Sequence, residues 1–123
     1  MPKKILVVDD KANIVLSLEF LMKQAGYDVR TASDGEEALA AIDADPPDLI
    51  LLDVNMPTKN GFEVCETVRA RNEWSHIRII MLTAHGRDIE REKGLALGAD
   101  DYLTKPFAIR EVVSKVQELL EQS

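Results

Sequence analysis

Hydrophobic residues along the chain follow two alternating patterns. Short unbroken apolar runs are typical of strands buried on both faces of a parallel sheet, and they occur at residues 5–8, 49–52 and 79–82. Two further segments predict strands at the sheet edges. Residues 27–31 alternate between apolar and polar, and the apolar segment at 102–103 is very short.

Helical spacing, with apolar residues three or four positions apart, separates these strands. It predicts five helices, at about residues 14–25, 35–45, 62–68, 88–97 and 109–120. Gly26 ends the first helix, and Pro46-Pro47 follows the second. The fourth helix has few apolar positions and an interior glycine, Gly94. Because a helical glycine costs about 1 kcal/mol relative to alanine, we expect this helix to be the least rigid.

Five strands that alternate with five helices predict right-handed β–α–β crossovers and one parallel sheet. With the second and fifth strands at the edges, the strand order is 2-1-3-4-5, which is the order of flavodoxin-like doubly wound folds. We therefore expect an α/β three-layer (βα)5 sandwich that forms a single domain over residues 1–123. In such sheets, ligands bind beyond the carboxyl ends of the strands, near strands 1 and 3.

Composition and charge exclude several classes of function. The chain has 22 acidic and 15 basic residues and a net charge of −7, which argues against a nucleic-acid backbone or an anionic membrane as its main partner. The single cysteine, Cys65, excludes an internal disulfide and a multi-cysteine metal site. No apolar run approaches the roughly 18 residues of a membrane span, and the N-terminal run is too short for a signal peptide. We expect a cytoplasmic domain.

Acidic residues stand where two neighbouring strands are predicted to end. Asp9 and Asp10 close the first strand, and Asp53 closes the third. Two unit charges 4 Å apart repel by about 4 kcal/mol at an effective dielectric constant of 20. A hard divalent cation removes this repulsion, and a site made only of oxygen ligands suits Mg²⁺ or Mn²⁺. Thr83 and Lys105, at the ends of the fourth and fifth strands, add a hydroxyl and an ammonium group that can hold phosphoryl oxygens.

These residues resemble the receiver domains of two-component response regulators. The matching segments are Val-Val-Asp-Asp at 7–10, Asp-Gly-Glu-Glu-Ala at 34–38, Leu-Leu-Asp-Val-Asn-Met-Pro at 51–57 with Gly61, Leu-Thr-Ala at 82–84, and the ten residues 98–107. The resemblance implies a signalling switch rather than an enzyme with an external substrate. Such a switch accepts a phosphoryl group from a phosphohistidine of a sensor histidine kinase or a phosphotransfer protein, loses it slowly by hydrolysis, and acts on an effector protein or a fused output domain.

The resemblance also implies a role for each residue of the acidic group. Asp53 is the phosphoryl acceptor. Mg²⁺ is held by Asp9, Asp10 and Asp53, and the main-chain carbonyl of Asn55 completes the protein ligands. Lys105 pairs with the phosphoryl group. A carboxylate is already deprotonated, so the reaction needs no general base.

The output implied by the resemblance is conformational. Thr83 binds the attached phosphoryl group, Tyr102 changes rotamer, and the surface of the fourth helix, fifth strand and fifth helix changes for its partner. On the residues alone, an ordinary half-buried aromatic on an edge strand explains Tyr102 equally well. Asn55 and His85 lie two residues beyond Asp53 and Thr83, at positions that modulate the hydrolysis rate in similar domains.

Other functions fit the sequence less well. An aspartyl-phosphate phosphatase uses an Asp-x-Asp motif, whereas Asp53-Val54-Asn55 lacks the second acid. A flavodoxin-like electron carrier needs a loop rich in hydroxyl groups and glycine after the first strand, where residues 10–13 read Asp-Lys-Ala-Asn. A passive binding module that never accepts phosphate stays open, as does the choice between a stand-alone receiver and part of a longer chain.

Three individual residues carry less information. Cys65 is expected to be an inert buried thiol on the third helix. Trp74 lies in a polar loop, either as a partner contact or simply exposed. The Lys105-Pro106 peptide bond is compatible with a cis geometry.

Overall fold

A computed structural model describes residues 2–84 and 88–121 of the chain. Its five strands form one parallel sheet in the order β2-β1-β3-β4-β5, which confirms the predicted topology. The strands are β1 (Lys4–Val8), β2 (Asp28–Ala32), β3 (Leu49–Asp53), β4 (Arg78–Ala84) and β5 (Asp101–Lys105). Because every strand runs in the same direction, all five carboxyl ends lie at one edge of the sheet.

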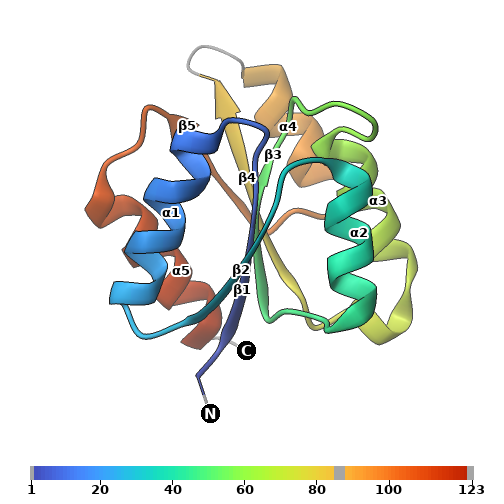
Figure 1. Ribbon diagram of the computed structural model, residues 1–123. Helices are drawn as coiled ribbons and strands as arrows, with labels where there is room; N and C mark the ends of the chain where they lie inside the picture. Colours follow the sequence, from blue (N-terminus) through green and yellow to red (C-terminus); the bar gives the residue numbers. More distant parts are fainter. Residues whose placement is uncertain (1, 85–87, 122–123) are drawn as a thin grey trace.

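Helices cover both faces of the sheet, as Figure 1 shows. One face carries α1 (Ala12–Gln24) and α5 (Ile109–Glu121), and the other carries α2 (Gly35–Ala44), α3 (Gly61–Ala70) and α4 (Asp88–Ala96). A single turn of 3₁₀ helix, η1 (Asn72–Trp74), follows α3. The result is the expected three-layer α/β sandwich.

The core consists of two apolar clusters separated by the sheet. Successive side chains of a strand point to opposite faces, so β1 sends Leu6 and Val8 to the α2–α3–α4 side and Ile5 and Val7 to the α1–α5 side. All five residues of β3 are buried. This burial on both faces explains why the central strands have continuous apolar sequences.

Polar caps and close glycine contacts determine where α2 and α3 begin. The Asp34 side chain accepts a hydrogen bond from the Glu37 amide at 2.7 Å and caps α2. Asn60 and Glu63 form a reciprocal capping box at the start of α3. A Cβ atom at Gly61 would lie only 2.2 Å from the carbonyl oxygen of Asp53. A glycine at this position therefore lets α3 begin directly against the end of β3.

The structure changes several details of the sequence interpretation. β4 extends to Ala84 and β5 covers Asp101–Lys105, so both strands are longer than their apolar runs. Trp74 is only 3% exposed and packs in the core, so both interpretations that placed it at the surface are wrong. Its ring lies 3.9 Å from the Arg71 guanidinium, which provides the polar cover for this aromatic residue. The Lys105-Pro106 bond is cis, and Cys65 is buried as expected.

The two ends of the described chain lie on the same side of the molecule. β1 begins and α5 ends at the edge of the sheet opposite the carboxyl ends of the strands (Figure 1). Among the described residues, no helix is both long enough and apolar enough to span a bilayer.

Candidate functional site

Three carboxylates meet at the carboxyl ends of β1 and β3. Val8 pairs with Leu52 in the sheet register. Asp9 and Asp53 are the next residues of the two chain segments, so they lie side by side. One oxygen atom from each of Asp9, Asp10 and Asp53 lies within 4.8 Å of the other two. Asp9 is 0% exposed and Asp53 is 4% exposed, whereas Asp10 faces solvent. The sheet thus brings together the three acids that the sequence singled out.

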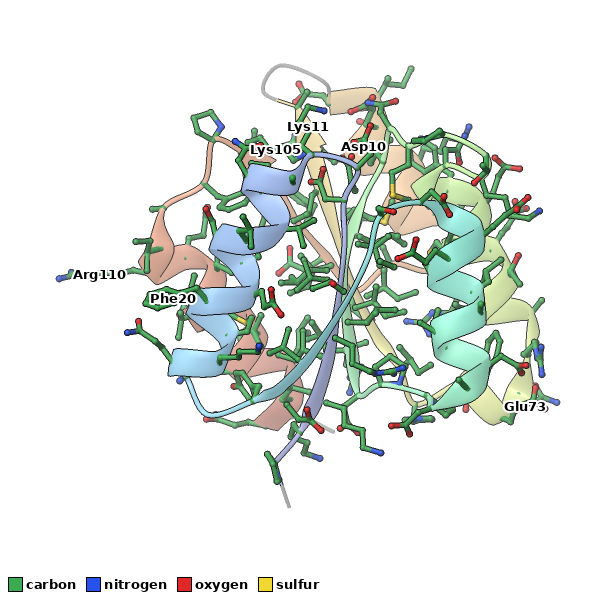
Figure 2. The ribbon with its side chains drawn as sticks, viewed as in Figure 1. Asp10, Lys11, Phe20, Glu73, Lys105 and Arg110 are labelled. Atoms are coloured by element: carbon green, nitrogen blue, oxygen red, sulfur yellow. The ribbon has the colours of Figure 1, made fainter. Side chains whose placement is uncertain are left out.

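Lys105 partly neutralises the negative charge of the two buried acids. Its Nζ atom donates hydrogen bonds to Asp9 Oδ2 at 2.8 Å and to Asp53 Oδ1 at 3.2 Å. Burial alone would lower the pKa of the lysine, but the hydrogen bond to Asp9 and the charge of Asp53 outweigh it, and the pKa is raised. The lysine therefore stays protonated. Figure 2 shows Lys105 and Asp10 at the same end of the molecule, although Lys105 comes from β5 and Asp10 follows β1.

One lysine does not neutralise the whole group. The pKa of the Asp53 carboxyl is raised from 3.8 to about 6, because burial and, to a smaller extent, the Asp9 carboxylate raise it more than Lys105 lowers it. Among the described residues, none donates a hydrogen bond to the buried Asp53 Oδ2 atom. A buried charged oxygen without a partner is unfavourable. A divalent cation with oxygen ligands satisfies both the unpaired oxygen and the excess charge, so this carboxylate set fits Mg²⁺.

Thr83 is close to the acidic group but its hydroxyl is turned to the backbone. Asp53 pairs with Leu82 across β3 and β4, so Thr83 lies one residue beyond Asp53 at the same edge. It is 1% exposed, and its Oγ1 atom donates a long hydrogen bond of 3.5 Å to the Leu103 carbonyl. Because this bond is weak, a stronger acceptor near Asp53 could replace Leu103 as its partner.

Glu90 contacts the site through Asn55, and the sequence interpretation did not identify it. The Asn55 side chain donates from Nδ2 to Glu90 Oε2 on α4 at 3.4 Å, and Glu90 is 5% exposed. A signal for it exists in the sequence. Glu90 and Gly94 are four residues apart and Leu97, just after α4, follows three residues later, so an acid stands on the helix face that packs inward.

Tyr102 lies apart from the acidic group, between α4 and α5. Its hydroxyl accepts a hydrogen bond from Arg91 at 3.2 Å, and the Arg91 guanidinium lies 4.7 Å from the ring centroid. The ammonium group of Lys115 lies 5.5 Å from the same ring. These contacts place Tyr102 on the predicted output surface. His85, the other residue assigned to rate control, lies outside the described residues.

The arrangement suits transfer of a phosphoryl group. Asp53 offers a carboxylate that can act as a nucleophile, Lys105 offers a positive charge held beside it, and the three acids can hold a cation that offsets the charge of an incoming phosphoryl group. Reactions of this kind depend mainly on positioning and electrostatics. Nothing in the geometry requires a general base.

Comparisons with known proteins point to one family. Residues 5–117 match the family model described as the response regulator receiver domain. The chain is 50% identical over 123 residues to the alkaline phosphatase synthesis transcriptional regulatory protein PhoP of Bacillus subtilis. That alignment covers 100% of this chain and 50% of PhoP, so the chain spans half the length of this relative.

Solved structures give the same result. A candidate response regulator from Chloroflexus aurantiacus superposes with a TM-score of 0.95 at 39% identity, covering 98% of this chain and 99% of that one. The chemotaxis response regulator CheY4 of Vibrio cholerae superposes with a TM-score of 0.90 at 36% identity, covering 97% and 99% of the two chains.

Proposed function

Because this chain belongs to the response regulator receiver domain family, we propose that Asp53 is its phosphoryl acceptor and that Mg²⁺ is its cofactor. The family acts in two-component signalling through phosphorylation and partner switching. The observation that carries the assignment is the buried Asp53 carboxylate, which shares Lys105 with Asp9 and retains one oxygen without a hydrogen bond among the described residues.

The proposed reaction is a nucleophilic attack by Asp53. A carboxylate oxygen attacks the phosphorus of a phosphohistidine on a histidine kinase or phosphotransfer protein. The new bond joins phosphorus to oxygen, the phosphorus–nitrogen bond breaks, and its electron pair stays on the imidazole nitrogen. The product is an acyl phosphate, which water slowly hydrolyses. In this respect the chain catalyses its own modification and does not turn over a separate substrate.

Lys105 keeps its place during this reaction. It already contacts Asp53 Oδ1 at 3.2 Å, so its ammonium group can pair with a phosphoryl oxygen with little rearrangement. Asp9 holds the lysine from the other side at 2.8 Å. Asp9 therefore acts both as a proposed metal ligand and as an anchor for the cation.

Mg²⁺ would be held by the carboxylates of Asp9, Asp10 and Asp53 and by the main-chain carbonyl of Asn55. When bound, it supplies positive charge that screens the acids from the phosphoryl oxygens. Mn²⁺ has similar ligand preferences and is expected to substitute.

The proposed output follows from the new charge at Asp53. A phosphoryl group adds about −1.5 to −2 charge and three acceptor oxygens. Thr83 then exchanges its 3.5 Å bond to Leu103 for a phosphoryl oxygen, and Tyr102 responds on the surface formed by α4, β5 and α5. His85 stays a predicted modulator of hydrolysis together with Asn55.

The direct test is mass spectrometry of the intact protein after incubation with acetyl phosphate and Mg²⁺. We expect a gain of one phosphoryl group in the wild type and none in Asp53→Asn. Asp28→Asn, which removes an exposed acid of β2, is the matched control and should gain the group normally. A gain that persists in Asp53→Asn would reject the acceptor assignment.

The same experiment distinguishes a receiver from both alternatives, since a passive binding module and a fast phosphatase would each show no mass gain. Release of inorganic phosphate from acetyl phosphate, which only the phosphatase would accelerate, distinguishes these two from each other. The partners proposed here are a histidine kinase or phosphotransfer protein and a protein effector or output domain. The absence of direct nucleic-acid contact, the single domain over residues 1–123 and the cytoplasmic location typical of response regulators stay predictions.

A further inference from the structure

Glu90 is a buried carboxylate outside the residues assigned to the reaction. It lies on α4, it is 5% exposed, and its Oε2 atom accepts the hydrogen bond from Asn55 Nδ2 at 3.4 Å. Asn55 follows the end of β3 by two residues, and its main-chain carbonyl belongs to the proposed Mg²⁺ site. This contact joins α4 to the short segment that carries Asp53.

A carboxylate at this position needs an explanation. Burying a charged group is unfavourable unless the group makes polar contacts, and this face of α4 packs on β4, where an apolar residue would be the ordinary choice. A Cβ atom at Gly94 would lie 3.0 Å from Met81 Cγ, so the helix is closely seated on the strand one turn further on. α4 is therefore packed against β4 near Gly94 and bonded to the β3 loop at Glu90.

We propose that Glu90 is a positioning residue: through Asn55 it holds the loop after β3 in place for the cation, and it transmits occupancy of the acidic site to α4. This role rests on the proposed function, because it presupposes that the acidic site binds Mg²⁺. It adds a physical link between that site and the output surface. It assigns α4 a contact with the site that does not pass through Thr83 or Tyr102.

Thermodynamic coupling makes this role measurable. If cation binding biases α4 through the Asn55–Glu90 bond, disturbing the α4 end of that bond must weaken cation binding by the same factor. Loss of a short hydrogen bond to a charged group changes an equilibrium by about tenfold or more, and the Asn55–Glu90 bond, at 3.4 Å, should contribute less. We therefore expect a roughly 3- to 10-fold loss of Mg²⁺ affinity when the acceptor at residue 90 is removed.

Four variants separate the hydrogen bond from charge and from general packing. Glu90→Gln keeps an acceptor oxygen for Asn55 and loses the charge, whereas Glu90→Met keeps a similar shape without an acceptor. Asn55→Ala removes the donor from an exposed residue, so it tests the same bond with little risk to folding. Glu92→Gln removes an exposed acid from the same helix and is the matched control.

The first measurement is a calorimetric titration of each variant with Mg²⁺ alone. Glu90→Met and Asn55→Ala should each lose about 3- to 10-fold in Mg²⁺ affinity. Glu90→Gln should keep an affinity within about twofold of the control Glu92→Gln. In the double variant, Glu90→Met should add no further loss to that of Asn55→Ala. Equal losses in Glu90→Gln and Glu90→Met, or additive losses in the double variant, would overturn the role of this bond.

The second measurement is amide hydrogen exchange of α4 with and without Mg²⁺. The wild type and Glu90→Gln should show a Mg²⁺-dependent change in residues 88–96, and Asn55→Ala should not. An unchanged response in Asn55→Ala contradicts the link. Neither the titration nor the exchange measurement uses a phosphoryl donor, so both are independent of the mass-spectrometric test of Asp53. The proposed role of Glu90 can therefore fail while the acceptor assignment of Asp53 holds, and the reverse.

Discussion

Lys105 illustrates how a single residue balances the acidic site. It bonds to two carboxylates that are almost fully buried, Asp9 and Asp53, yet one positive charge faces three negative ones. The raised pKa of Asp53 reflects its burial first and the neighbouring Asp9 carboxylate second, and Lys105 offsets them only in part. Without a cation, the site therefore lowers the stability of the fold, which is a common feature of functional residues.

Removing the charge of Asp53, the proposed acceptor, should stabilise the metal-free protein. In Asp53→Asn the side chain keeps its shape and loses the unfavourable charge. We therefore expect the free energy of unfolding to rise by about 3 kcal/mol at pH 7 in chelator, from a pKa shift of roughly two units. Urea denaturation followed by the fluorescence of Trp74, the only tryptophan, measures it. A lower stability than wild type would contradict this prediction.

The same residue predicts a pH dependence with a definite sign. The pKa of Asp53 is about 6 in the folded protein and 3.8 ordinarily. Between these values the folded state binds a proton that the unfolded state does not, so the contribution of Asp53 to stability falls as pH rises through this window. The advantage of Asp53→Asn over the wild type should therefore shrink as pH falls from 7 towards 4. Denaturation at several pH values without metal checks it, and a constant difference would exclude this cause.

Sequence patterns identified the acidic residues but not the internal partners of the site. Asp9 and Asp53 stand at the ends of two strands with clear apolar runs, and Lys105 ends the fifth strand, whose apolar run is short, so the predicted topology brings the three together. Glu90 was missed because a charged residue in a helix is ordinarily solvated, and its spacing with Gly94 and Leu97 is a weak signal without the three-dimensional contact with Asn55. Trp74 was misplaced because its sequence neighbours are polar, although its ring reaches the core.

The start of α3 shows how an element depends on the site it supports. The Gly61 amide donates to the Val54 carbonyl at 2.9 Å, and the missing side chain lets the helix approach the Asp53 main chain.

The length of each element was the property that the sequence predicted least well. β5 continues through Thr104 and Lys105 because backbone pairing with β4 does not require apolar side chains.

Gly61→Ala should damage stability and phosphorylation together. Its Cβ atom would lie 2.2 Å from a backbone oxygen that cannot rotate away, so α3 or the end of β3 must shift. We expect a loss of about 2 kcal/mol in the free energy of unfolding and slower phosphorylation by acetyl phosphate.

Gly94→Ala is the comparison for this variant. Its new Cβ would meet only the flexible side chain of Met81, at 3.0 Å, and the gain in helix propensity of about 1 kcal/mol offsets the contact. Its stability should therefore stay within about 1 kcal/mol of wild type. Equal losses in the two variants would show that the backbone contact of Gly61 is not the cause.

Across the whole molecule, the acidic site and the core are connected through the central strands. Asp53 is the last residue of β3, and every residue of that strand is buried. A cation bound only by the folded state stabilises that state by mass action, by about 2.7 kcal/mol at a hundredfold excess over its Kd. Binding at one edge of the sheet should thus raise the stability of the entire fold.

Mg²⁺ should therefore raise the thermal unfolding temperature of the wild type in a concentration-dependent way. Asp9→Asn, which removes a buried member of the carboxylate group, should lose most of this increase, whereas Asp28→Asn should retain it. Trp74 fluorescence reports the unfolding of both variants. A similar increase in all three proteins would indicate nonspecific binding to the acidic surface and not occupancy of this site.

The position of the chain ends has a practical consequence. β1 begins and α5 ends on the side away from Asp53, so a tag joined before β1 or after α5 would point away from the acidic site. The protein can be immobilised on a sensor chip through either tag with the acidic site facing the flow. Kinase docking and phosphoryl-dependent partner exchange could then be followed in real time on one oriented layer of molecules.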